Sequence, residues 1–198
     1  MTRQLFAYDR QSGTTKQVIS SGEDEKSFSK EEKLRRERAR IMSVGVTEYS
    51  WAKRANRILV PRDGALYVQD GVSDGAEASL RRLFDPTDEK WAEVGRGALL
   101  DAKLSEDGQR ALFVWEREVC ACDITPSSTS STASEDDPCT PRRLTHGARE
   151  AGLTNGVADY CAQEEMDRYT GYWPSPDGGE YVAFEEVDDT RIPRIDPL

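Results

Sequence analysis

The chain has 198 residues, a formal net charge of −10 and only 36% hydrophobic residues. The excess of acidic side chains argues against binding to nucleic acid or to an anionic membrane, because both depend on clustered Lys and Arg that replace counterions on phosphate. No run approaches the roughly 18 consecutive apolar residues that a membrane-spanning helix needs, and the 16 aromatic residues argue against a wholly disordered chain.

The first residues have neither the apolar core nor the small-residue cleavage site of a secretory signal, so we expect a cytoplasmic protein. In that compartment the four cysteines are expected to stay thiols, although their number would suffice for two disulfides. A strand over 118–124 would place Cys120 and Cys122 on one face, but no other Cys or His has the spacing of a zinc site. We therefore expect no metal and no cofactor.

Short alternating runs of apolar residues, separated by turn residues, predict antiparallel strands along most of the chain. The Asp-Gly pairs that begin at Asp63 and Asp177 supply the positive φ that tight turns demand. The predicted strands and hairpins lie at 4–9 with 15–19, 57–61 with 65–70, 110–115 with 118–124, and from 175 to 186.

The first two full hairpins repeat as part of a larger unit. Each is followed by a polar connector and a short strand that contains Arg-Arg-Leu, at 80–84 and at 141–145. Without the Ser/Thr-rich tract at 125–138, the spacing of these strands falls within the about 40–50 residues of a β-propeller blade. We therefore expect an all-β fold, a partial β-propeller of about three four-stranded blades, to which 4–9 and 15–19 add half of another.

Two segments depart from this pattern. Residues 27–42 predict one short charged helix, with Ser29 as N-cap, Glu32 three residues later, and acidic residues before basic ones. It has few apolar residues to bury, so it should be marginal without a partner. The tract at 125–138 is predicted to be a low-complexity loop insertion.

Residues 154–173 concentrate acidic and aromatic side chains in a connector where a propeller needs only a few turn residues. The simplest interpretation of Glu164 and Glu165 is a solvated charged face. Adjacent carboxylates repel each other, however, and a pair fixed by tertiary structure would make a receptor for one ammonium group, which has three donors. The segment therefore favours recognition of an amine.

Residues 163–173 read Gln-Glu-Glu-Met-Asp-Arg-Tyr-Thr-Gly-Tyr-Trp. This run resembles the double-Glu segment of the dipeptidyl peptidase IV family of serine peptidases, particularly its cytosolic branch of dipeptidyl peptidases 8 and 9. Residues 34–46 are similar to that branch's arginine-bearing helix, and 142–145 to one of its blade strands. The sequence departs from the family at 173–176, Trp-Pro-Ser-Pro, where the family usually has Trp-Trp-Ser-Pro or Trp-Trp-Cys-Pro.

The resemblance implies an eight-bladed propeller that covers an α/β-hydrolase domain, and release of N-terminal dipeptides, preferably after proline. It also implies that Glu164 and Glu165 bind the α-ammonium of the substrate. Arg40, or another arginine of 35–40, would donate hydrogen bonds to the peptide carbonyl and orient it. The implied supporting residues around the double-Glu pair are Asp167, Arg168, Tyr169 and Tyr172.

We expect the hydrolase domain and its nucleophile elbow to be absent, and the sole histidine, His146, to lie in a turn. The chain should then have no catalytic residues. The expected partners are peptides with free N-termini and the hydrolase domain of a full-length protein; a homodimer stays open, and no nucleic-acid or membrane partner is expected. The alternatives are a non-catalytic propeller-like interaction module and a truncated remnant.

Overall fold

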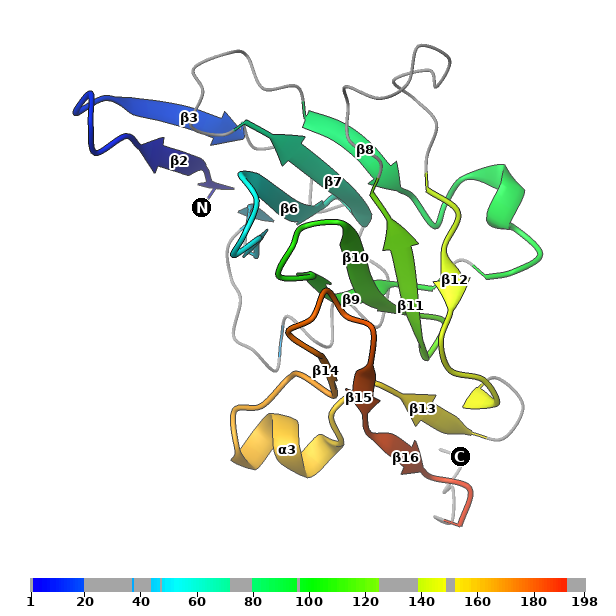
Figure 1. Ribbon diagram of the computed structural model, residues 1–198. Helices are drawn as coiled ribbons and strands as arrows, with labels where there is room; N and C mark the ends of the chain where they lie inside the picture. Colours follow the sequence, from blue (N-terminus) through cyan, green and yellow to red (C-terminus); the bar gives the residue numbers. More distant parts are fainter. Residues whose placement is uncertain are drawn as a thin grey trace.

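The computed structural model in Figure 1 describes residues 2–19, 37, 44–46, 48–71, 80–95, 97–124, 139–148 and 152–191. Over these residues the protein consists mostly of β-strands. The helical elements with described bounds are a short 3-10 helix, η2 (Glu89–Trp91), and one α-helix, α3 (Tyr160–Glu165). The expected all-β class is therefore confirmed.

The first four-stranded sheet is antiparallel, in the order β5 (Ser50–Trp51), β6 (Arg57–Arg62), β7 (Ala65–Asp70), β8 (Leu80–Phe84). The turn between β6 and β7 consists of Asp63 and Gly64, with φ of 51° and 81°. Two left-handed residues in a row form the tight turn that matches the twist of the flanking strands. The predicted hairpin is confirmed.

The second four-stranded sheet repeats this arrangement with β9 (Leu99–Leu104), β10 (Arg110–Trp115), β11 (Glu118–Asp123) and β12 (Arg142–Arg143). The two strands that contain Arg-Arg, β8 and β12, each pair with the third strand of their own sheet. The repeat inferred from sequence therefore corresponds to two sheets of the same topology.

The third unit comprises β13 (Leu153–Asn155), β14 (Tyr172–Pro174), β15 (Val182–Phe184) and β16 (Glu186–Asp188). Here β13 pairs with β16 and β14 with β15, so the described part of this unit consists of two-stranded pairs. At the other end, β2 (Leu5–Tyr8) and β3 (Thr15–Ile19) form the predicted hairpin, and β1 (Thr2–Arg3) pairs with β4 (Val44–Gly45) in parallel.

Successive units pack face to face, as alternate residues of β10 show. Phe113 and Trp115 pack in a core shared with the first sheet, whereas Leu112 and Val114 pack against Tyr172 of the third unit. Because side chains alternate between the faces of a strand, β10 is buried on both faces. Its continuous apolar sequence follows from this double burial.

The first sheet is sandwiched in the same way. Leu59 of β6 packs toward the second sheet, while its neighbours Ile58 and Val60 pack toward Leu5 and Val18 of the N-terminal hairpin. The stacking order of the sheets thus follows the order of the chain. Consecutive antiparallel sheets that stack face to face are consistent with a partial propeller.

Aromatic rings fill the core between the two four-stranded sheets. The ring of Phe84 stacks on Phe113 at a centroid distance of 5.2 Å and meets the edge-on ring of Trp115 at 5.1 Å. Trp91 of η2 closes the cluster, 5.7 Å from Phe84. Such contacts add about 0.5–1.5 kcal/mol each beyond the buried area.

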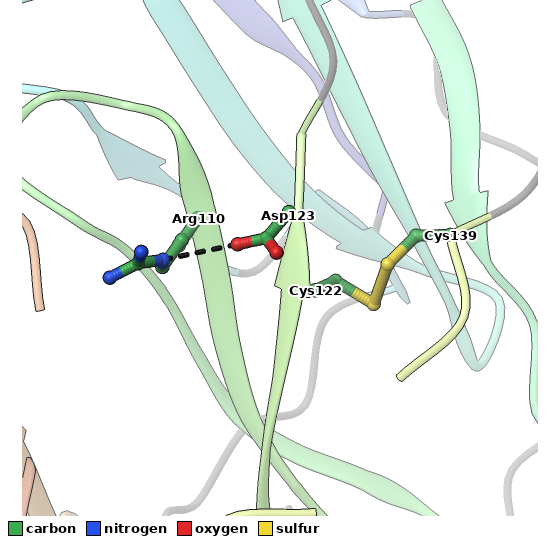
Figure 2. Close-up of a disulfide and its surroundings, with 4 residues drawn as sticks. All are labelled: Arg110, Cys122, Asp123 and Cys139. Carbon is green, nitrogen blue, oxygen red and sulfur yellow. Dashed lines mark hydrogen bonds and ion pairs between the residues drawn. A yellow bond between two sulfur atoms is a disulfide. The ribbon is translucent and has the colours of Figure 1, made fainter. Parts of the chain in front are cut away.

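The cysteines differ from the expectation of four thiols. Cys122 and Cys139 form a disulfide, with their Cα atoms 5.8 Å apart (Figure 2), while buried Cys120 and exposed Cys161 are free. The prediction of thiols was wrong for the bonded pair, because it considered compartment and spacing and had no measure of which strands meet. Cys120 and Cys122 do share one core face, as predicted.

Two predicted segments lie outside the described residues. They are the loop at 125–138 and almost all of the helix at 27–42, of which Glu37 alone is described and is helical. Arg40 therefore has no described position. Over the described ranges, no helix is long and apolar enough to span a bilayer, and no group of three or more potential metal ligands is present.

Candidate double-Glu site

The double-Glu segment is an excursion from a split strand. Residues 156–171 leave the sheet after β13 and return to it at β14, and both strands pair with the continuous run formed by β15 and β16. The ladder is bridged at the split, where Gly156 N donates to Glu185 O and Glu185 N donates to Gly171 O, each at 2.8 Å. We call residues 156–171 the excursion.

Glycine allows the two legs of the excursion to meet. A Cβ on Gly171 would lie 2.5 Å from the carbonyl carbon of Val157, and a Cβ on Gly156 would lie 2.4 Å from a methyl group of Val119. Gly156 also has φ of +77°, a conformation that glycine adopts without steric cost. One residue further into the excursion on each leg, Val157 and Thr170 form a β-bridge, which closes the base of the excursion.

The helix α3 forms the tip of the excursion (Figure 1). Its N-cap is Asp159, whose carboxylate accepts a hydrogen bond from Ala162 N at 3.1 Å. Ala162 is the buried residue of the helix, and its carbonyl accepts from Met166 N and Arg168 N. Asp167, with φ of +52°, makes the left-handed turn that ends the helix.

Glu164 and Glu165 are the last two residues of α3, and both are exposed. Consecutive helical residues project about 100° apart, so the two carboxylates diverge from one helical end. Carboxylates at a helix C-terminus face the negative end of the macrodipole, and α3 has no basic residue in its last turn. This placement conflicts with the macrodipole, as local features at functional sites often do.

Arg168 ties the returning leg of the excursion to the split strand. Its guanidinium donates to Thr170 O at 2.8 Å and forms an ion pair with Glu185 at 2.8 Å. It also lies 5.9 Å from the ring centroid of the exposed Trp173. Both ionic partners are about one-third exposed, so the geometry of the contacts matters more than their Coulomb energy.

Tyr172 ties the excursion to the second sheet. The side chain is fully buried, and its hydroxyl lies within hydrogen-bonding distance of the carbonyls of Leu112 (2.9 Å) and Asp101. Burial, with the nearby charge of Asp101, raises the pKa of this phenol well above its ordinary value. Tyr172 is therefore a neutral hydrogen-bond donor that fixes the end of the returning leg.

Asp101 and Lys103 of β9 were not singled out by the sequence interpretation. Lys103 Nζ lies 2.7 Å from the Asp101 carboxylate, 2.8 Å from Tyr172 O and 3.8 Å from the centroid of the Tyr172 ring. Burial raises the pKa of Asp101 and lowers that of Lys103, and their mutual attraction opposes both shifts. Their spacing gave no usable signal, because the register shift in β9 and the positive φ of Asp101 break the regular alternation of side chains at this point.

The remaining predicted residues occupy surface positions. Tyr169 is half-buried on the returning leg, and Asp167 is exposed at the end of α3. His146 is exposed in the segment after β12, as expected, and its carbonyl accepts from Asn155 at 3.4 Å. Glu164 and Glu165 are adjacent in α3, and Arg40 lies outside the described residues.

One serine motif was overlooked in the sequence. Residues 71–75, Gly-Val-Ser-Asp-Gly, fit the Gly-x-Ser-x-Gly pattern of a nucleophile elbow. An elbow joins a strand to a helix at the edge of a hydrolase sheet, whereas this run connects β7 to β8, which are antiparallel neighbours. Ser73 lies outside the described residues. The pattern therefore occurs in the wrong topological context for a catalytic serine, and the absence of a triad stays a prediction.

Comparison with known proteins agrees with the resemblance seen in the double-Glu segment. Dipeptidyl peptidase 8 from Homo sapiens is 29% identical in an alignment of 182 residues that covers 83% of this chain and 18% of that protein. Dipeptidyl peptidase 4 from Felis catus is 29% identical over 46% of this chain and 10% of that protein. Inactive dipeptidyl peptidase 10 from Mus musculus is 29% identical over 55% of this chain and 13% of that protein.

The chain thus spans less than one-fifth of the length of each of these relatives. The profile of the family described as "Dipeptidyl peptidase IV (DPP IV) N-terminal region" matches residues 65–197, which are more than half of the chain. These residues include β7 and β8 of the first four-stranded sheet, the whole of the second sheet and the whole excursion. The chain therefore belongs to the family of dipeptidyl peptidase IV N-terminal regions.

Proposed function

We propose that this chain is the substrate-binding propeller portion of a serine-type dipeptidyl peptidase, in which Glu164 and Glu165 bind the N-terminal ammonium of a peptide. The observation that carries the proposal is the geometry of α3. Two exposed carboxylates end a short helix, and that helix is fixed by a cap, a buried alanine and a closed base. Two adjacent carboxylates suit a ligand that carries a positive charge and several hydrogen-bond donors.

The chemistry suits an α-ammonium group in particular. An ammonium has three donors, and two carboxylates that diverge from one helical end can accept from two of them. A site that holds the N-terminus fixes the distance from the chain end to the scissile bond, so it selects for release of dipeptides. Arg40 would orient the peptide carbonyl, as the family resemblance implies.

The hydrolytic chemistry is proposed for an α/β-hydrolase domain that acts together with this propeller. Two of the relatives are named dipeptidyl peptidases, which supports release of dipeptides as the parent activity. The proposed preference for cleavage after proline rests on the family resemblance alone. Purified chain 1–198 should not cleave a Gly-Pro chromogenic substrate. Turnover that a serine-directed phosphonate abolishes would contradict this assignment.

The binding role can be tested on the chain itself by calorimetric titration with the peptide Gly-Pro-Gly and with its N-acetylated form. Glu164→Gln and Glu165→Gln should each weaken binding of the free-amine peptide by about tenfold or more, the effect of losing one charge-assisted hydrogen bond. Glu93→Gln is the matched control. Glu93 is an exposed glutamate between η2 and β9, and its substitution should not change the affinity for either peptide. Equal affinity of wild type for both peptides would refute the proposal.

A non-catalytic interaction module or a truncated remnant is the alternative. The similarity to inactive dipeptidyl peptidase 10 supports the first of these, because that relative is named inactive and matches 55% of this chain. Sequencing the coding region beyond position 198 distinguishes the cases. A Gly-x-Ser-x-Gly segment followed by Asp and His supports the peptidase, and its absence supports the module.

A cytoplasmic location belongs to the same proposal. The disulfide between Cys122 and Cys139 does not support it, because disulfides persist mainly in oxidising compartments. Counting the free thiols of the protein in a freshly alkylated cytoplasmic extract tests whether Cys122 and Cys139 are bonded in that compartment.

A further inference from the structure

Lys103 occupies an unusual position beneath the excursion. Its ammonium contacts the Asp101 carboxylate (2.7 Å), the backbone carbonyl of Tyr172 (2.8 Å) and the face of the Tyr172 ring (3.8 Å to the centroid). All three contacts involve either its own strand or the residue at which the excursion rejoins the sheet. The Lys103 ammonium therefore links Asp101 to Tyr172.

Asp101 is aimed at the same point by a distortion of β9. The register between β9 and β10 shifts between Leu112 and Val114, and Asp101 has φ of +50°. A bulge of this kind redirects a side chain that a regular strand would point elsewhere. The redirected carboxylate accepts from Lys103 and lies 3.4 Å from Thr170 Oγ1, while the Asp101 carbonyl accepts from the Tyr172 hydroxyl.

We propose that Asp101 and Lys103 are positioning residues that hold Glu164 and Glu165 in the geometry for binding a peptide N-terminus, acting through Thr170 and Tyr172. This inference rests on the proposed function of the double-Glu pair. Neither residue touches the substrate in this scheme. Their effect reaches α3 because the returning leg between Arg168 and Tyr172 is short and closed at its base.

The contacts made by the two legs of the excursion support an effect of Asp101 and Lys103 on α3 through the returning leg. The outgoing leg is held by the β-bridge of Val157 and by the packing of Gly156 on Val119, which involve no charge. On the returning leg, by contrast, Arg168 pairs with Glu185, and Lys103 holds Tyr172 from the second sheet. Two charged side chains from outside the excursion, those of Glu185 and Lys103, therefore contact the leg that follows the two glutamates.

The test uses three variants of chain 1–198: Lys103→Met, Asp101→Asn and the double variant. Asn tolerates positive φ nearly as well as Asp, so Asp101→Asn removes the charge while it leaves the bulge intact. Lys103→Arg is the conservative variant. Lys90→Met is the matched control, because Lys90 also lies over an aromatic ring, that of Trp91 at 4.9 Å, but belongs to η2 and not to the excursion.

Two readouts are needed. Hydrogen exchange followed by mass spectrometry reports on residues 157–171, with the β6–β7 hairpin as the internal reference for an intact fold. Lys103→Met should speed exchange in 157–171 by about tenfold, as expected for the loss of a contact to a charged group, and leave the hairpin unchanged. In calorimetry, Lys103→Met should weaken the binding of Gly-Pro-Gly by a similar factor. The affinity for the acetylated peptide should not change. Lys103→Arg should bind Gly-Pro-Gly almost as well as wild type.

The outcomes separate the two hypotheses. Unchanged exchange in 157–171, or faster exchange with unchanged affinity for the free-amine peptide, overturns the positioning role. A loss in Lys90→Met as large as in Lys103→Met overturns it as well. If wild type binds the free-amine peptide no more tightly than the acetylated one, the proposed function is wrong, and the positioning role is wrong with it. That result needs no variant, so it is distinguished from a failure of the positioning role alone. In the double variant, exchange no faster than in Lys103→Met alone supports action as a unit, and additive effects count against it.

Discussion

Glu118 provides a sharp test of how the second sheet is joined to the third unit. Its side chain is 1% exposed, and its carboxylate accepts hydrogen bonds from Thr145 Oγ1 (2.6 Å), Ala148 N (2.8 Å) and Asn155 Nδ2 (2.9 Å). Asn155 belongs to β13, so one carboxylate links β11 to the next unit. Although burial favours the neutral acid, these bonds lower the pKa of Glu118 below its ordinary value.

The substitution Glu118→Gln keeps the size of this side chain but places an amide group against donors. At least one of the three bonds becomes a contact between two donors, and the others lose the charge of the acceptor. Hydrogen bonds to a charged group contribute about 1.5–3 kcal/mol each, so we expect a loss of about 2–4 kcal/mol of unfolding free energy. For a chain of this length that lowers Tm by about 5–15 °C.

Urea unfolding of chain 1–198 measures this loss, with Glu93→Gln as the exposed control. A carboxyl group whose pKa is lower in the folded than in the unfolded protein contributes stability that is present above its unfolded pKa. That contribution disappears as pH falls through the folded pKa. The difference between wild type and Glu118→Gln should therefore shrink below about pH 4. A difference of under 0.5 kcal/mol at pH 7, or one that does not change with acid, would refute this reasoning.

Two further predictions concern the disulfide and the base of the excursion. Reduction of the Cys122–Cys139 disulfide, which closes a separation of 17 residues, should cost about 3 kcal/mol of unfolding free energy in urea titrations with and without reductant. Alkylation of the unfolded, unreduced protein should label two thiols, and labelling of four would contradict the bond. Gly171→Ala should cost about 1–3 kcal/mol and speed exchange in 157–171, because the new Cβ would lie 2.5 Å from backbone. Gly64→Ala, with open space around its Cβ position, should leave that exchange unchanged.

Much of the fold could be predicted because the strand signals are local. Asp63-Gly64 fixes the turn between two alternating runs, and the pairing of β6 with β7 follows from it. The hairpin of β10 and β11 is harder, because its turn residues, Glu116 and Arg117, take φ of 53° and 64° without any glycine. Double burial of both strands compensates for that strained turn.

The parts that sequence reasoning missed depend on long-range contacts. Cys122 meets Cys139 only because the chain returns to the edge of β11 after the tract at 125–138. The link from Lys103 to Tyr172 spans two units of the fold, so no local spacing reveals it. Helix α3 has six residues, too few for a periodic apolar pattern, so the sequence did not predict this helix, and the site proposed for the segment stays a prediction.

The split strand has a consequence for how the excursion can change. Hydrogen bonds from Gly156 to Glu185 and from Glu185 to Gly171 carry the ladder across the split, so the sheet keeps its register whatever lies between the two glycines. An insertion or deletion at the tip of the excursion would alter the reach of the carboxylates without shifting a single strand pair. Variation in the length of the excursion can therefore arise without cost to the scaffold.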